Sequence, residues 1–160
     1  MFQAISIAAI AILTAVDLLT KHIAVTTVKV NGPKEFLFGL FQFRYTENTG
    51  AAFSSFSDNT ALLSVFTGVI LLAAVILLLT HKIKSNFVNA CIILACAGGL
   101  GNLIDRIRLG FVVDFIEPLF IDFAVFNFAD CCITVGAFLL IGYQIYDLIR
   151  DHKKKKASEK

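Results

Sequence analysis

The chain has 160 residues, of which 58% are hydrophobic and 16% are charged, with a formal net charge of +2 and a mean hydropathy of +0.81. A soluble globular domain is typically about 45–50% apolar and about 25% charged, so this composition excludes that class. A membrane span needs about 20 mostly apolar residues, and the sequence therefore predicts a single integral membrane domain over residues 1–160.

Four apolar runs predict an all-α polytopic membrane protein with transmembrane helices over about residues 2–25, 60–80, 87–105 and 128–149. No basic residue precedes the first run and no cleavage site is evident before Asp17, so we expect a retained helix and not a signal peptide. Lys82, Lys84 and the lysines at 153–156 predict that both termini lie in the cytoplasm, because basic residues beside a span tend to stay there.

Residues 150–160 form a basic cytoplasmic tail in this topology. The four lysines at 153–156 are typical both of a disordered, solvated tail and of a topology signal, and the two interpretations are compatible. No aromatic residue is interleaved with these lysines, so no nucleic-acid partner is expected.

The segment between the first two helices, residues 26–58, is polar by comparison, and Gly32 with Pro33 predicts a turn. Aromatic and polar side chains alternate over residues 41–45, which is typical of a β-strand. The segment is interpreted as a small sheet packed on the helices, or as an amphipathic platform at the membrane interface, where aromatic rings are favoured. The two interpretations do not exclude each other.

Small residues gather in the third apolar run, over residues 96–101. They indicate close helix packing in lipid; a phosphate-binding loop is disfavoured because no Gly-Lys-Ser/Thr follows. The four cysteines, at positions 91, 96, 131 and 132, lie inside apolar runs without metal-ligand spacing, so they are interpreted as packing residues and no disulfide is expected.

The polar residues of the spans converge on one side of the membrane in this topology. Asp17 and Lys21 lie near the outer end of the first helix, and Asn102, Asp105 and Arg106 lie at the outer end of the third. Asp17 and Lys21 are four residues apart, so they share a helix face and are expected to pair. Asp105 is expected to offset the burial of the neighbouring Arg106 charge.

Asp114 and Asp130 have no cation beside them in the sequence. A buried carboxylate without a cation tends towards its neutral form, and two such groups close together tend to share one proton. This arrangement suits amide hydrolysis, in which one carboxylate acts as general base on a water and the other, protonated, polarises the scissile carbonyl. Two other readings stay open: both acids face water, or Asp130 caps the fourth helix.

Other chemistries find less support in the sequence. The three histidines are scattered, and neither Gly-x-Ser-x-Gly nor His-Glu-x-x-His occurs, so neither a serine nucleophile nor a zinc protease is expected, and no cofactor or metal site is predicted. A small proton-coupled transporter or assembly subunit is the rival class. A transporter is expected to place its acid near the bilayer midplane, whereas these acids lie at helix ends.

Five blocks of the sequence, in this order, resemble the lipoprotein signal peptidases, also called signal peptidase II. The blocks are Asp17-Leu-Leu-Thr-Lys21, Asn48-Thr-Gly-Ala-Ala-Phe53, Gly98-Gly-Leu-Gly-Asn-Leu-Ile-Asp-Arg106, Val113-Asp-Phe115 and Phe126-Asn-Phe-Ala-Asp130. The resemblance implies an aspartyl endopeptidase that removes the signal peptide from diacylglyceryl-modified prolipoproteins and cuts just before the lipid-bearing cysteine. It implies that Asp114 and Asp130 are the catalytic pair. The residues that it implies as support for the site or the substrate are Asn48, Gly50, Asn102, Asp105, Arg106 and Asn127. The pair formed by Asp17 and Lys21 is expected from its spacing to act as scaffold for the site.

The resemblance also implies a small extracytoplasmic sheet at about residues 34–45 and a short, mobile amphipathic helix after Asn48. It implies the bacterial cytoplasmic (inner) membrane as the location and inhibition by cyclic peptides such as globomycin. We expect a monomer surrounded by membrane lipids, with its active site at the extracytoplasmic face where the polar residues converge. The chain departs from the family pattern in two places: Cys131 stands where serine is common, and the link between the two aspartates is short. These departures concern the shape of the loop at residues 117–126.

Overall fold

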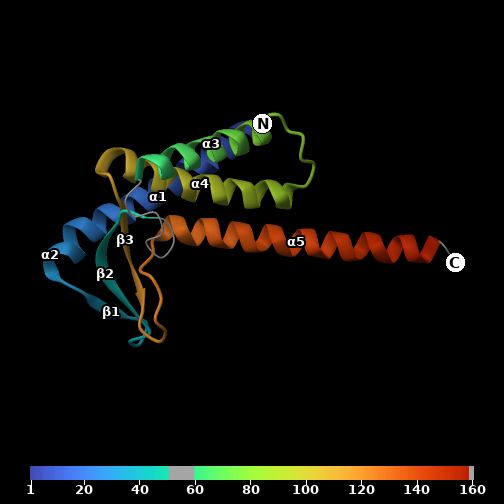
Figure 1. Cartoon of the computed structure of the whole chain (residues 1–160). Helices are drawn as coiled ribbons and strands as arrows, with labels where there is room; N and C mark the ends of the chain where they lie inside the picture. Colours follow the sequence, from blue (N-terminus) through green and yellow to red (C-terminus); the bar gives the residue numbers. More distant parts are fainter. Residues whose placement is uncertain (51–59, 159–160) are drawn as a thin grey trace.

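Four long helices and a small sheet at one end of them make up the fold (Figure 1). The computed structural model describes residues 1–50 and 60–158. The long helices are α1 (Phe2–Ile23), α3 (Thr60–Leu79), α4 (Asn86–Leu109) and α5 (Phe128–Ser158). Within the described residues, the four stretches long and apolar enough to cross a membrane begin at Phe2, Thr60, Asn86 and Phe128. The fold is therefore that of a polytopic membrane protein, as the hydropathy predicts.

The first helix is longer than the sequence pattern indicates. A π-helical turn, η1 (Ala24–Val28), and a short α2 (Lys29–Asn31) continue it beyond residue 25. Gly32 ends it with a φ of +84°, a conformation that favours glycine. The extension carries buried Ala24, which packs against the sheet, so the extra turns serve to hold the sheet on the end of α1.

The sheet has three antiparallel strands in the order β1 (Lys34–Phe36), β2 (Phe41–Asn48) and β3 (Val112–Pro118). The small sheet expected at about residues 34–45 is confirmed, but β3 was not predicted. Val113 and Phe115 of β3 are buried against the end of α1. The short amphipathic helix expected after Asn48 would lie in residues 51–59, outside the described part of the chain.

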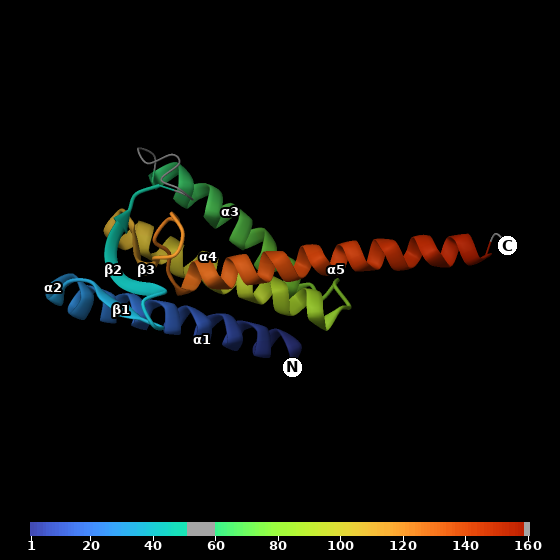
Figure 2. The same cartoon turned by 90° about the horizontal axis from the view of Figure 1, so that it is seen from below.

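Helix α4 lies in the middle of the bundle and contacts α1, α3 and α5 (Figure 2). Its glycines allow these contacts, because a Cβ on each would meet a different helix. A Cβ on Gly98 would overlap the first turn of α5, one on Gly99 would lie 2.9 Å from Leu71 of α3, and one on Gly101 would overlap the Asp17 carboxylate of α1. The close helix packing predicted from the small residues is confirmed.

The four lysines at 153–156 lie on helix α5, which runs without a break to Ser158 (Figure 1). The structure therefore has them on a continuous helix and not in an irregular tail. The thiols of Cys91, Cys96 and Cys132 are buried and free, and the free thiol of Cys131 is half-buried, which agrees with their interpretation as packing residues.

We predict that Gly98→Ala destabilises the fold by about 1–3 kcal/mol, because the added methyl overpacks the contact between α4 and α5. Gly142→Ala on α5 is the matched control. A Cβ there would have no heavy atom within 4 Å, and alanine is preferred over glycine inside a helix by about 0.5–1 kcal/mol. Thermal unfolding of both variants in detergent checks this; equal effects of the two substitutions would contradict the packing argument.

Candidate active site

All ten residues singled out in the sequence belong to one connected set of polar contacts. The set joins side chains and backbone groups of α1, α4, β2, β3 and α5 where these elements meet. Its members are Asp17, Lys21, Asn48, Gly50, Asn102, Asp105, Arg106, Asp114, Asn127 and Asp130. Residues up to 112 positions apart in the chain are thus brought into contact.

The Lys21 side chain lies at the centre of the scaffold and is only 3% exposed. Its ammonium nitrogen lies 2.9 Å from Asp17 Oδ2 and 2.9 Å from Asp105 Oδ2, and it donates a 2.8 Å hydrogen bond to Asn102 Oδ1. The ammonium group is therefore surrounded by two carboxylates and one amide oxygen, all within 2.9 Å. The pairing of Asp17 with Lys21 that their spacing predicts is present.

Asp105 favours the half-buried Arg106 charge, as expected, but within the described residues the two side chains do not form a direct ion pair. The Asp105 carboxylate contacts Lys21 and accepts a 3.1 Å hydrogen bond from the backbone N–H of Val113, which ties the start of β3 to α4. Neighbours in a helix do not face each other, so Arg106 takes another direction. Its Nη2 donates a 3.0 Å hydrogen bond to the backbone carbonyl of Gly50.

The side chains of Asp17, Asn127 and Asp130 fix the start of α5 by hydrogen bonds to its backbone. Asp17 Oδ1 accepts a 2.9 Å hydrogen bond from the backbone N–H of Ala129, one of the donors that a helix N-terminus leaves without an internal partner. Asn127 Oδ1 accepts from the backbone N–H of Asp130 at 2.9 Å, and Asp130 Oδ2 accepts from the backbone N–H of Asn127 at 3.2 Å. This reciprocal pair is a capping box. Asn127 is therefore the cap, and Asp130 lies in the first helical turn with a fixed orientation.

Asp114 lies on β3 and is 1% exposed. Its carboxylate accepts hydrogen bonds from Asn48 Nδ2 at 2.9 Å and from Asn127 Nδ2 at 2.6 Å. Burial, together with the negative charge of Asp130, raises the pKa of the Asp114 carboxyl to about 6. The two amide donors oppose this rise because they favour the ionised form.

Amide groups separate the two aspartates from each other and from Lys21. Asn102 Nδ2 donates to Asp130 Oδ1 at 2.8 Å, and Asn127 Nδ2 donates both to Asp114 and, at 3.1 Å, to Asn102 Oδ1. Among the described residues, neither Asp114 nor Asp130 has a cationic side chain within 4.0 Å. The two carboxylates thus interact through Asn127 without direct neutralisation by a cation.

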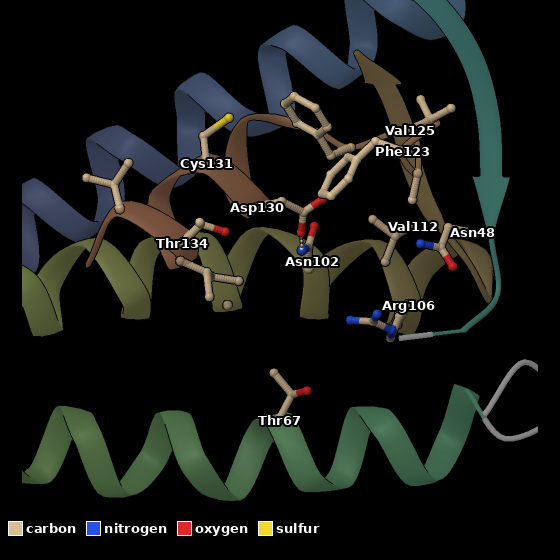
Figure 3. A pocket seen from close by; sticks show the side chains of 15 residues that line it. Asn48, Thr67, Asn102, Arg106, Val112, Phe123, Val125, Asp130, Cys131 and Thr134 are labelled. Atoms are coloured by element: carbon tan, nitrogen blue, oxygen red, sulfur yellow. Dashed lines mark hydrogen bonds between the residues drawn. The ribbon is translucent and has the colours of Figure 1, made fainter. Parts of the chain in front are cut away.

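A cavity of about 600 Å³ opens beside Asp130, between α3 and α5 and over α4 (Figure 3). Asn48, Asn102, Arg106 and Asp130 form its polar end, and most of the remaining lining is apolar. Asp114 is not part of the lining and lies behind Asn48. The carboxylate of Asp130 thus lines the cavity directly, whereas the buried carboxylate of Asp114 is separated from it by the amide of Asn48.

Several side chains that line this cavity are not among the residues predicted from the sequence. Thr67 reaches it from α3, Phe123 and Val125 from the loop before α5, and Thr134 from α5 (Figure 3). Helical spacing could have indicated Thr134, which follows Asp130 by one turn. No comparable signal marks Thr67. Within residues 1–50 and 60–158, no group of three or more His, Cys, Asp or Glu side chains is arranged to hold a metal ion.

Comparison with known proteins gives consistent matches over most of the chain. The family model described as signal peptidase (SPase) II matches residues 9–146. The lipoprotein signal peptidase of Streptococcus thermophilus (strain CNRZ 1066) is 39% identical over 133 residues, which are 83% of this chain and 87% of that protein. The lipoprotein signal peptidase of Streptococcus pyogenes serotype M5 (strain Manfredo) is 38% identical over 130 residues, which are 81% of this chain and 86% of that protein.

Two solved structures, both described as bacterial membrane enzymes studied by the in meso method, share this fold. The first has a TM-score of 0.83 at 33% identity, over 91% of this chain and 90% of its own. The second has a TM-score of 0.80 at 34% identity, over 90% of this chain and 94% of its own. The similarity of fold therefore extends over about nine tenths of the chain.

Removing the central ammonium should cost far more than removing an exposed one. We predict that Lys21→Met destabilises the fold by about 3–5 kcal/mol, because it leaves the buried carboxylates of Asp17 and Asp105 without their cation. Lys29→Met is the control: Lys29 pairs with Glu47 at 3.0 Å, but both side chains are exposed, so little change is expected. Unfolding midpoints in detergent compare the two variants, and similar midpoints would refute the central role of Lys21.

Proposed function

Because the chain belongs to the signal peptidase II family of membrane aspartic endopeptidases, we propose that it removes the signal peptide from diacylglyceryl-modified prolipoproteins and cuts just before the lipidated cysteine. The observation that carries this proposal is the pair of carboxylates, Asp114 and Asp130, joined by amides beside an apolar cavity. Membership of an endopeptidase family weighs against the transporter alternative.

In the proposed mechanism Asp130 is the general base and Asp114 is the acid. Asp130 lines the cavity, so it can take a proton from a water whose oxygen attacks the scissile carbonyl carbon. Asp114, whose pKa is raised to about 6, gives its proton to the carbonyl oxygen. Asn48 lies between Asp114 and the cavity, and its amide swings from the carboxylate onto the substrate backbone as the peptide binds.

Collapse of the tetrahedral intermediate completes the reaction. Asp130 returns its proton to the leaving nitrogen, the carbon–nitrogen bond breaks, and Asp114 recovers its proton from the hydroxyl that becomes part of the new carboxyl group. Asn102 and Asn127 orient the two carboxylates throughout, because each donates an amide N–H to one of them. Arg106, fixed on the Gly50 carbonyl, supports the wall of the cavity.

The substrate reaches this site from the lipid. The cavity lies between two membrane-spanning helices, α3 and α5 (Figure 3), so acyl chains enter from the bilayer while water enters from the side of the sheet. The basic residues at 82–84 and 150–156 support a cytoplasmic position of both termini, and with it a site at the extracytoplasmic face of the bacterial cytoplasmic membrane. The enzyme acts as a monomer, and globomycin-type cyclic peptides occupy the same cavity.

Cleavage of a diacylated prolipoprotein by purified enzyme in nanodiscs tests this function. We predict that Asp114→Asn and Asp130→Asn each reduce turnover by at least about 10²-fold, because asparagine keeps the size of the side chain but cannot exchange the proton. Asp122→Asn is the control, since Asp122 is an exposed acid in the loop between the two aspartates. If a folded Asp114 or Asp130 variant keeps the turnover of the control, that aspartate is structural.

The pH dependence of kcat/KM tests which aspartate is the acid. We predict that kcat/KM falls as the pH rises through about 6, because the free enzyme then loses the Asp114 proton. Asn48→Ala removes a hydrogen bond that lowers the pKa of Asp114. The pKa of Asp114 is therefore expected to rise in this variant, and the decrease in kcat/KM should move to higher pH. Arg44→Gln on the same strand should leave the midpoint in place, and an Asn48→Ala midpoint that stays or moves down contradicts the assignment.

A further inference from the structure

Six large apolar side chains are exposed together at the far end of the sheet, and they are called here the apolar tip. Their exposed fractions run from 42% to 104%. They come from the turn between β1 and β2 and from the loop that follows β3: Leu37, Phe38, Leu40, Leu119, Phe120 and Ile121. Contiguous exposed apolar surface of this kind marks an interaction site.

The two loops of the apolar tip are joined into one unit. The backbone N–H of Leu119 donates a 2.9 Å hydrogen bond to the Leu40 carbonyl. The rings of Phe41 and Phe120 contact each other edge to face, with centroids 5.5 Å apart. Segments that lie about 80 residues apart in the chain therefore present a single surface.

The turn between β1 and β2 adopts an unfavourable backbone conformation at two of its exposed apolar residues. Leu37 and Phe38 have φ values of +50° and +59°, ahead of Gly39 at +79°. Large side chains rarely adopt this left-handed conformation. Strain of this kind is typical of functional segments, and here its visible result is that Leu37 and Phe38 are exposed.

The apolar tip lies beside the helical bundle, not over its end. Figure 1 shows the strands running across the direction of the long helices, so that the β1–β2 turn and the loop after β3 meet to one side of α5. A bilayer around the four spans would have its interface near the start of α5. Asp122, an exposed acid next to Ile121, opposes deep insertion and favours a shallow position.

We propose that the apolar tip inserts into the interfacial region of the lipid leaflet that surrounds the start of α5. Phenylalanine and leucine side chains drive such interfacial binding. Lipid is the occupant that the position favours, because the neighbouring helix α5 is long and apolar enough to cross a membrane and exposes apolar side chains such as Phe138 and Ile141. Strand β3 carries Asp114, so the insertion would also set the height of this aspartate above the leaflet; that consequence rests on the proposed function, whereas the insertion does not.

Tryptophan fluorescence tests the insertion directly, since the chain has no tryptophan. Phe38→Trp and Phe120→Trp each place one probe in one of the two loops, at positions that are more than half exposed. Phe138→Trp, in the middle of α5 and 72% exposed, is the lipid-facing reference. Lys156→Trp, exposed at the far end of α5, is the aqueous reference. Each variant is reconstituted into phosphatidylcholine vesicles that carry bromine either near the headgroup or deep in the acyl chains.

Insertion predicts that both tip probes emit at shorter wavelength than Lys156→Trp and lose most of their fluorescence to the bromine near the headgroup. The deep bromine should quench Phe138→Trp more strongly than either tip probe. If either tip probe emits and resists quenching as Lys156→Trp does, the joined tip is not inserted and the proposal is overturned. The readout involves no proteolysis, so it can fail while the proposed function stands, and the reverse also holds.

Discussion

One buried ammonium group organises the arrangement of the helices. Removing the Lys21 charge from water is costly, and the cost is offset only by close contacts to opposite charge and to hydrogen-bond acceptors. Asp17 and Asp105 supply the charge, and each uses its carboxylate a second time, Asp17 on the start of α5 and Asp105 on the start of β3. A single charge thus fixes the relative positions of α1, α4, β3 and α5.

The glycines of α4 are the steric counterpart of this electrostatic constraint. The Asp17 carboxylate occupies the space that a Cβ on residue 101 would need, and the first turn of α5 occupies that of residue 98. Polar contacts between helices require short distances, and small residues in lipid-embedded helices provide them. The glycine pattern and the charged residues therefore serve one purpose, namely to bring the starts of α5 and β3 together.

Local signals account for the parts of the structure that the sequence predicts well. Hydropathy gives the four helices, alternation gives β2, and a four-residue spacing gives the contact of Asp17 with Lys21. Strand β3 could not be predicted in this way, because it is nearly continuous apolar sequence around Asp114 and pairs with a strand about 70 residues earlier. The partner of Asp105 depends on the packing of α1 against α4, which no local pattern encodes.

One feature of the site was within reach of local rules: an Asn-x-x-Asp sequence at the start of an apolar helix has the form of a capping box. The rule identifies Asn127 as the cap and orients Asp130. It leaves open that the Asn127 amide also reaches Asp114, because that contact requires β3 to be in place. From the sequence, only the resemblance to a family linked Asn127 to Asp114. The structure shows that Asn127 donates a hydrogen bond to Asp114 and that Asn102 connects Asn127 to Asp130.

Both carboxylates are contacted by the amides of asparagine side chains. The buried cation that the fold requires is thereby kept apart from the two groups that carry the proposed chemistry. In the proposed mechanism one of the two carboxylates carries a proton for the scissile carbonyl, and a cation in contact with Asp114 or Asp130 would disfavour that protonated form. An amide donates a hydrogen bond and orients a carboxylate without adding charge. The Lys21 ammonium, which the fold requires, meets the oxygen of Asn102, and the amide nitrogen of the same side chain meets Asp130. One amide thus keeps the structural cation near the pair of carboxylates and out of contact with it.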